Sequence, residues 1–159
     1  MPAEKKMMER YPSNRWFKWH NANPFGKITG DCTTRALAVA LDVSWEHALK
    51  MQFDVAMSTG LSPESIGACE KVLKGHGFER VGQPRFDDGR KVSFRELFDM
   101  AALDGLDCLK KPEALLRLNE KSRAFCNAGS HHCVAVAGLR VHDIWDSSQE
   151  KVGVMWVKF

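Results

Sequence analysis

The sequence predicts an α+β fold, with helices in the first two thirds of the chain and antiparallel strands in the last third. Between residues 32 and 118, apolar side chains recur at the three- and four-residue spacing of helices that bury one face. From residue 123 onward they fall in short alternating or β-branched runs, which are typical of strands. No repeat or shift in composition marks a second domain, so we expect residues 1–159 to form a single domain with residues 1–20 as an N-terminal arm.

The arm mixes basic and aromatic side chains. This composition can suit nucleic acid, but a short arm that packs its aromatic residues on the domain is commoner, and we do not expect a nucleic-acid partner. Residues 14–19 are expected to be a short strand or an extended cover. Residues 21–30 form a loop rich in turn formers, and this loop must lie beside the helix that follows it.

The first helix is expected to begin at Cys32 and to continue to Leu41, because no residue in between breaks a helix. Thr29 or Asp31 is expected to cap it by accepting hydrogen bonds from its unpaired N–H groups. Arg35 is expected to pair with Asp31 or to brace the helix against the sheet. Cys32 thus lies at the positive end of the helix dipole, a position that lowers the pKa of a thiol.

Further start signals predict the other helices. Ser44 is expected to cap a helix over 45–57, Ser62 to cap one with Pro63 at its first position, and Ser93 to open one through 102 with a capping box. A short helix is expected over 112–118 and a possible strand over 78–81. The remaining strands are expected at 124–126, 133–137, 139–145 and 152–158. The predicted architecture is a cysteine-bearing helix and further helices packed on a small C-terminal antiparallel sheet.

Composition limits the function classes. Hydrophobic residues make up 44% of the chain and charged residues 27%, as in a globular protein with its own core. No apolar run approaches the ~20 residues that span a bilayer, and the first residues do not resemble a signal peptide. We therefore expect a cytoplasmic protein without a membrane partner. The five cysteines are odd in number and form no C-x-x-C pair, so no disulfide framework is expected; those other than Cys32 are expected to be structural.

A partner base for Cys32 is found at the start of a predicted strand. The β-branched residues Val134 and Val136 lie at every second position from His132 and therefore share its face of the strand. His132 is thus expected to face the helix layer where Cys32 lies, and His131 to point away. A tight turn then makes the next strand antiparallel. Asp143 or Asp146 on that strand can reach the imidazole, and sequence alone does not set the register between them.

Further motifs are Asn-Pro-x-Gly-Lys and Gly-Asp-Cys-x-x-Arg-Ala near the start of the chain and Val-x-Asp-x-Trp-Asp-Ser near its end. With the chain order Cys, His, Asp, they resemble the papain-like cysteine peptidase superfamily. More narrowly, they look like a group of small bacterial and phage proteins assigned to that superfamily. The resemblance covers residues 21–41 and 131–156 and implies a papain-like domain.

The resemblance also implies a function, hydrolysis of a peptide, isopeptide or amide bond in a peptide or protein substrate through a thioester, with no cofactor. Cys32 would be the nucleophile and His132 the proton carrier. Asp143 would orient the imidazole, with Asp146 as the alternative third member.

The oxyanion donors are less closely matched. The superfamily's Gln, six residues before the nucleophile, is replaced by Gly26. Asn23 is the nearest amide that could stabilise an oxyanion together with the Cys32 backbone N–H, and a simple Asn-Pro turn is the competing role of Asn23.

Three other functions stay open. The chain could be a degenerate papain-like domain that binds a partner without turnover, or an acyltransferase that uses the same thioester. A metal site of Cys32, His131, His132 and Cys133 is disfavoured, because adjacent strand residues point in opposite directions. A hydrolase predicts an alkylatable Cys32 of low pKa, a metal site predicts bound zinc, and a binding module predicts neither.

Overall fold

The computed structural model describes residues 2–110 and 112–159, and within them the chain forms six α-helices and a six-stranded mixed sheet. The helices are α1 (Pro2–Arg10), α2 (Cys32–Leu41), α3 (Trp45–Thr59), α4 (Ile66–Gly75), α5 (Phe94–Ala102) and α6 (Pro112–Leu115), with a 3-10 helix, η1 (Leu106–Cys108). The strands are β1 (Phe17–Trp19), β2 (Glu79–Gly82), β3 (Arg123–Ala128), β4 (His132–Ala137), β5 (Arg140–Asp143) and β6 (Val152–Lys158). The predicted α+β class is confirmed, with strands concentrated towards the C-terminus.

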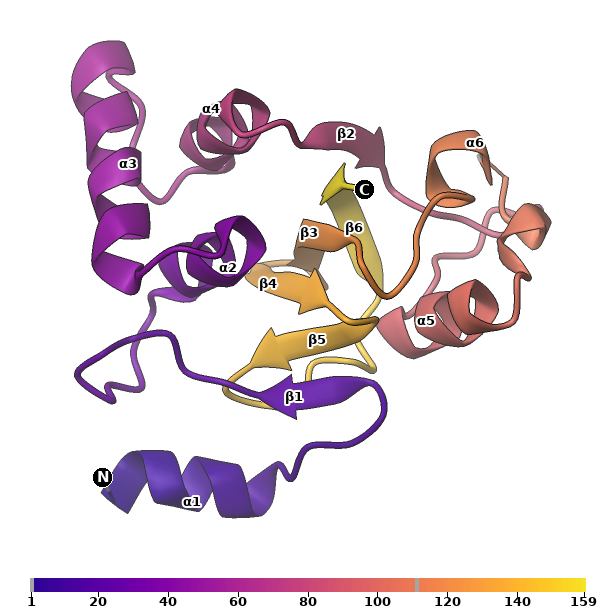
Figure 1. The fold of residues 1–159 in the computed structure, drawn as a ribbon, viewed down its shortest axis with the longest axis horizontal. Coiled ribbons are helices and arrows are strands. Elements are labelled where there is room, and N and C mark those ends of the chain that lie inside the picture. Colours follow the sequence, from indigo (N-terminus) through magenta and orange to yellow (C-terminus); the bar gives the residue numbers. More distant parts are fainter. Residues whose placement is uncertain (1, 111) are drawn as a thin grey trace.

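The sheet has the strand order β1-β5-β4-β3-β6-β2 (Figure 1). All neighbouring strands are antiparallel except β1, which runs parallel to β5 and pairs Phe17 with Val141 and Trp19 with Asp143. The expected sheet, confined to the last third of the chain, is thus extended at both edges by short strands from earlier segments. Strands of three and four residues carry too little alternation to reveal their pairing in a sequence.

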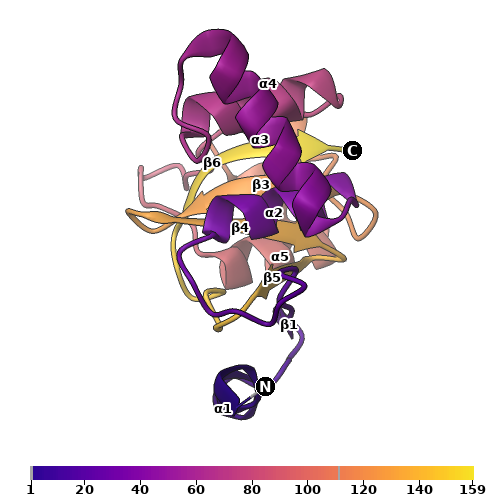
Figure 2. The ribbon, with the colours of Figure 1, turned by 90° about the vertical axis from the view of Figure 1, so that its left-hand side faces the viewer.

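Helices cover both faces of the sheet, with α2, α3 and α4 on one face and α5 on the other (Figures 1 and 2). Cys133 and Ala135 of β4 pack in the cluster formed by α2, α3 and α4, whereas Val134 and Val136 pack with the apolar residues of α5. The expectation that the β-branched face of β4 turns toward the Cys32 helix is therefore wrong. Because both faces of β4 are buried, alternation could not distinguish them.

The starts of α3 and α5 match the predicted caps, and that of α4 does not. Ser44 accepts a hydrogen bond from the His47 N–H and starts α3, and Ser93 accepts one from the Glu96 N–H and starts α5. The predicted start of α4 at Ser62 is wrong, since the helix begins three residues later with Ser65 as its cap. A serine that can cap stands at both positions, and the Ser62 carbonyl instead accepts hydrogen bonds from the Ser65 N–H and hydroxyl in the turn before the helix.

The arm contains helix α1, which was not expected, and the strand β1, one of the two alternatives expected for residues 14–19. Figure 1 shows α1 at the edge of the molecule, beyond β1. The described side chains of α1 are mostly exposed. Phe17 in β1 is fully buried and anchors the arm on the domain. Among the helices described, none is long and apolar enough to cross a membrane.

Candidate active site

Cys32 is the first residue of α2, and it lies half-buried where this helix packs against β4. Asp31 is the N-cap residue, but its side chain makes no capping hydrogen bond, so the predicted side-chain cap is wrong. The carboxylate instead forms an ion pair with Arg35. The first N–H groups of α2 are thus not occupied by a cap, and their partial positive charge acts on Cys32.

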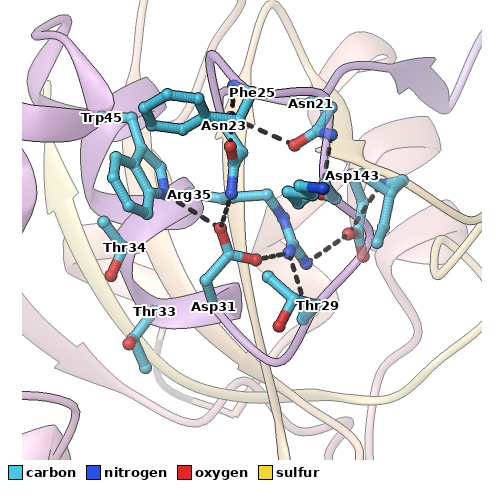
Figure 3. A network of polar contacts seen from close by, with 12 residues as sticks. Asn21, Asn23, Phe25, Thr29, Asp31, Thr33, Thr34, Arg35, Trp45 and Asp143 are labelled. Atoms are coloured by element: carbon cyan, nitrogen blue, oxygen red, sulfur yellow. Dashed lines mark hydrogen bonds and ion pairs between the residues drawn. The ribbon is translucent and has the colours of Figure 1, made fainter. Parts of the chain in front are cut away.

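Arg35 links the start of α2 to the sheet, as Figure 3 shows. Its side chain is buried, and its guanidinium lies between the carboxylates of Asp31 and Asp143, 3.8 Å from the Asp143 Oδ1. It also donates a hydrogen bond to the Thr29 carbonyl. Both roles expected for Arg35, partner of Asp31 and brace to the sheet, are therefore present in one side chain.

His132 and Asp143 are in direct contact. The His132 Nε2 lies 2.6 Å from the Asp143 Oδ2, with His132 at the first position of β4 and Asp143 at the last position of β5. Asp143 is only 3% exposed and also accepts hydrogen bonds from the Ser147 hydroxyl and the Ile144 N–H, each at 2.8 Å. These bonds fix the carboxylate, and hence the imidazole plane.

Asp146 has a different position. Its carboxylate accepts hydrogen bonds from Arg95 and Asn14, each at 3.0 Å, and from Ser148. Of the two candidate third members, Asp143 is the one that contacts His132. Asp146 ties β5 to α5 and to the loop before β1.

Cys32 and His132 line the same cleft, which has a volume of about 340 Å³. Hydrogen bonds with Cys133 and then with His132, together with the positive charge of the imidazolium, lower the pKa of Cys32 to about 4 against the opposing effect of burial. Burial lowers the pKa of the His132 imidazole. Hydrogen bonds with Asp143 and Cys32, and the negative charges of these two residues, outweigh burial and raise the pKa to about 9. Between these values the favoured state is a thiolate beside an imidazolium. Since Asp143 holds Nε2, Nδ1 is the ring nitrogen available to Cys32.

Asn23 is placed away from this cleft. Its side-chain N–H donates to the Asp31 carboxylate at 3.1 Å, and its side-chain oxygen accepts from the Phe25 N–H at 3.0 Å (Figure 3). Asn23 is also 6% exposed and does not belong to the residues that line the cleft. The structure therefore gives Asn23 the turn role.

Three features of the site were not expected from the sequence. His131 lines the cleft instead of pointing away. Cys133, taken as a structural residue, is buried next to Cys32, and the shared hydrogen bond raises the pKa of Cys133. Trp145 lies against His132 with ring centroids 5.2 Å apart, so it limits the movement of the imidazole. An aromatic residue two positions after Asp143 was the only signal for this last contact.

The remaining cysteines lie apart from the cleft. Burial raises the pKa of Cys69 to about 12 and also raises that of Cys126, while Cys108 is exposed on η1. All five cysteines are free. Among residues 2–110 and 112–159, no group of three or more His, Cys, Asp or Glu side chains is arranged to hold a metal ion.

Comparison of the chain with protein-family models, with curated proteins and with solved structures found no match. The chemistry of the site is therefore judged from its geometry. A thiolate paired with an oriented imidazolium can attack a carbonyl carbon and can protonate the group that leaves.

Proposed function

We propose that the protein is a cysteine hydrolase that cleaves a peptide, isopeptide or amide bond in a peptide or protein substrate. The observation that carries the proposal is the 2.6 Å contact between His132 and Asp143, made in the cleft that also contains Cys32 at the start of α2. A buried carboxylate that holds one imidazole nitrogen leaves the other directed at the nucleophile.

In the acylation step, the Cys32 thiolate attacks the carbonyl carbon of the substrate and forms a C–S bond. The carbonyl oxygen becomes an oxyanion, which the Cys32 backbone N–H stabilises by donating a hydrogen bond. The imidazolium of His132 then gives its Nδ1 proton to the amine nitrogen as the C–N bond breaks. The products are the free amine and a thioester on Cys32, with His132 neutral.

In the deacylation step, neutral His132 accepts a proton from water as the water oxygen attacks the thioester carbonyl. The C–S bond breaks, the acid product leaves, and the thiolate and imidazolium are restored. An amine in place of water would make the protein an acyltransferase through the same thioester. Asp143 stays ionised throughout and stabilises the imidazolium.

The placement of the three residues supports the papain-like interpretation of the fold. Cys32 opens a helix that packs on the sheet, His132 opens a strand, and Asp143 lies on the strand that follows. This is the order and the placement that the motifs of the sequence imply for papain-like peptidases.

The first test is the rate of Cys32 alkylation by iodoacetamide as a function of pH, followed by peptide mass spectrometry. The wild-type protein is expected to label at Cys32 with a midpoint near the pKa of about 4. His132→Ala should move the midpoint towards the ordinary thiol value of ~8.5. Cys108, exposed on η1, is the reference thiol within the same sample.

Turnover is tested with a library of fluorogenic peptide amides, with Cys32→Ala as the inactive control. Release of the fluorophore by the wild-type protein and not by Cys32→Ala is the expected result. A Cys32 that labels like Cys108, at a midpoint that His132→Ala does not move, would reject the hydrolase and favour a binding module.

A further inference from the structure

The oxyanion of the proposed reaction needs a second hydrogen-bond donor. One donor is the Cys32 backbone N–H, but the Asn23 amide donates to Asp31 and lies outside the cleft. Cysteine and serine hydrolases stabilise this oxygen with paired donors, and one of them is worth several kcal/mol, about 10²–10³ in rate. A second donor should therefore be sought among the polar residues that line the cleft.

Asn127 on β3 is the cleft residue that meets this need. Its register partner on β4 is Cys133, and both Cys133 and the neighbouring Phe125 pack on the α2 side of the sheet. Alternation along β3 places the side chain of Asn127 on that same side, where it lines the cleft with Cys32. β4 separates β3 from β5, so Asn127 and Asp143 approach the site from opposite flanks.

The amide of Asn127 retains hydrogen-bonding capacity. Its Nδ2 lies 3.7 Å from the Cys133 Sγ, a long contact with a weak acceptor. The side chain is half-buried, and in the part of the chain that the structure describes no other side-chain hydrogen bond involves it. An Nδ2–H group beside Cys133, which itself neighbours Cys32, can thus turn to a substrate oxygen without breaking a strong bond.

A β-bulge fixes the direction of Asn127. Cys126 pairs with Met155 and Ala128 with Val152, so residues 153–154 of β6 both face Asn127. A Cβ at Gly153 would lie 2.7 Å from the Asn127 Cβ and 3.1 Å from its carbonyl oxygen, so only glycine allows this approach. Bulges of this kind are frequent beside active sites, where they aim a side chain.

We propose that the Asn127 side-chain amide is the second oxyanion donor of this site, an assignment that rests on the proposed hydrolase function. Its Nδ2–H would donate to the substrate oxygen that becomes negative when the Cys32 thiolate attacks.

Two reagents separate an oxyanion role from other roles. p-Nitrophenyl acetate acetylates Cys32 through a tetrahedral oxyanion, forming a C–S bond and releasing p-nitrophenolate as the C–O bond breaks. Iodoacetamide alkylates the same thiolate by displacing iodide at a saturated carbon, and no oxyanion forms. Both rates are measured at pH 7, where Cys32 is ionised.

The variants are Asn127→Ala and Asn127→Leu, the second of which keeps the branched shape of the side chain, is somewhat larger and has no polar atoms. Both are expected to slow acetylation by roughly 10- to 100-fold and to leave the alkylation rate within about twofold of wild type. Asn119→Ala, which removes an exposed amide from a turn outside the cleft, should change neither rate. Thermal melting of each variant confirms that it is folded.

Unchanged acetylation in both variants would overturn the assignment, and so would an equal fall in both rates, because Asn127 would then act on the thiolate. If neither reagent modifies Cys32 of the wild-type protein faster than it modifies Cys108, the hydrolase proposal itself fails. The two failures are thus distinguishable.

Discussion

The ionisation of Cys32 depends on two consecutive residues of β4. His132 supplies a positive charge and Cys133 supplies a hydrogen bond, and the helix start adds the partial charge of its free N–H groups. Cys32 is the member of the cysteine pair that ionises, because Cys133 is the more buried of the two and Cys32 is the one hydrogen-bonded to His132. A thiol that would otherwise be an ordinary packing residue therefore takes part in lowering the pKa of Cys32.

Replacement of Cys133 by Ala should raise the pKa of Cys32, because the hydrogen bond with Cys133 is the largest cause that lowers it. The midpoint of iodoacetamide labelling is expected to move up by about one pH unit or more. Cys126→Ala, which removes a buried thiol from the face of the sheet opposite α2, is the matched control and should leave the midpoint in place. A midpoint equal in all three proteins would contradict the role of Cys133.

The pH dependence of kcat/KM should be bell-shaped. Activity requires the thiolate, so it rises as Cys32 loses its proton at a pKa of about 4, and it requires the imidazolium, so it falls as His132 loses its proton at about 9. Asp143→Asn should move the alkaline limb to lower pH, because the hydrogen bond and charge that raise the pKa of His132 are weakened. The profile is measured on the best substrate of the peptide library. An alkaline limb that Asp143→Asn leaves in place would show that His132 does not set it.

At the scale of elements, one buried cation holds α2 on the sheet. Arg35 is 6% exposed and contacts carboxylates from two elements, so its loss leaves Asp31 without its counter-charge and removes one of the two cations that face Asp143, the other being His132. Asp31 directly precedes Cys32, and Asp143 contacts His132. The position of Cys32 relative to His132 therefore depends on this link.

Arg35→Ala is expected to lower the free energy of unfolding by about 3–5 kcal/mol, the usual loss when one partner of a buried ion pair is removed. Lys50→Ala on α3 removes an exposed ion pair with Asp54 and should cost no more than about 1 kcal/mol. Urea denaturation measures both values. Losses of similar size in the two variants would mean that Arg35 does not compensate the buried carboxylates.

At the scale of the whole molecule, the N-terminal arm meets the C-terminal third of the chain at the site. β1 pairs with β5, and the His20 N–H donates to the Asp143 carbonyl at 2.8 Å. Helix α1 lies outside this arrangement, beyond the edge strand (Figures 1 and 2).

Deletion of residues 1–10 is therefore expected to leave the melting temperature within about 3 °C of wild type. In a chain of this size such a shift corresponds to a change of less than about 1–2 kcal/mol in the free energy of unfolding. Deletion of residues 1–20 also removes buried Phe17 and the whole of β1, and it should lower the melting temperature by about 10 °C or more. Differential scanning calorimetry compares the two. Equal melting temperatures would show that β1 does not support β5.

The sequence located the residues of the proposed triad better than the contacts around them. Cys32 and His132 could be found because helix starts and strand starts leave local signals, whereas the choice between Asp143 and Asp146 depended on a strand register that the sequence left open. The pairing of Arg35 with Asp31 could also be predicted, because the two residues lie one helical turn apart, whereas the contacts of Cys133 and Trp145 with the site depend on distant elements and left little signal. Pairing of β1 with β5 joins segments far apart along the chain, and a buried sheet hides which face of a strand meets which helix.

The distribution of the site along the chain also governs when it can be assembled. During synthesis α2 emerges long before β4 and β5, and β1 has no partner until β5 is complete. A nascent chain therefore carries Cys32 as an ordinary protonated thiol, with neither the imidazolium nor Cys133 beside it. Because such long-range pairings form late in folding, the proposed reactivity is expected only in the folded molecule, and the growing polypeptide would not be exposed to its own thiolate.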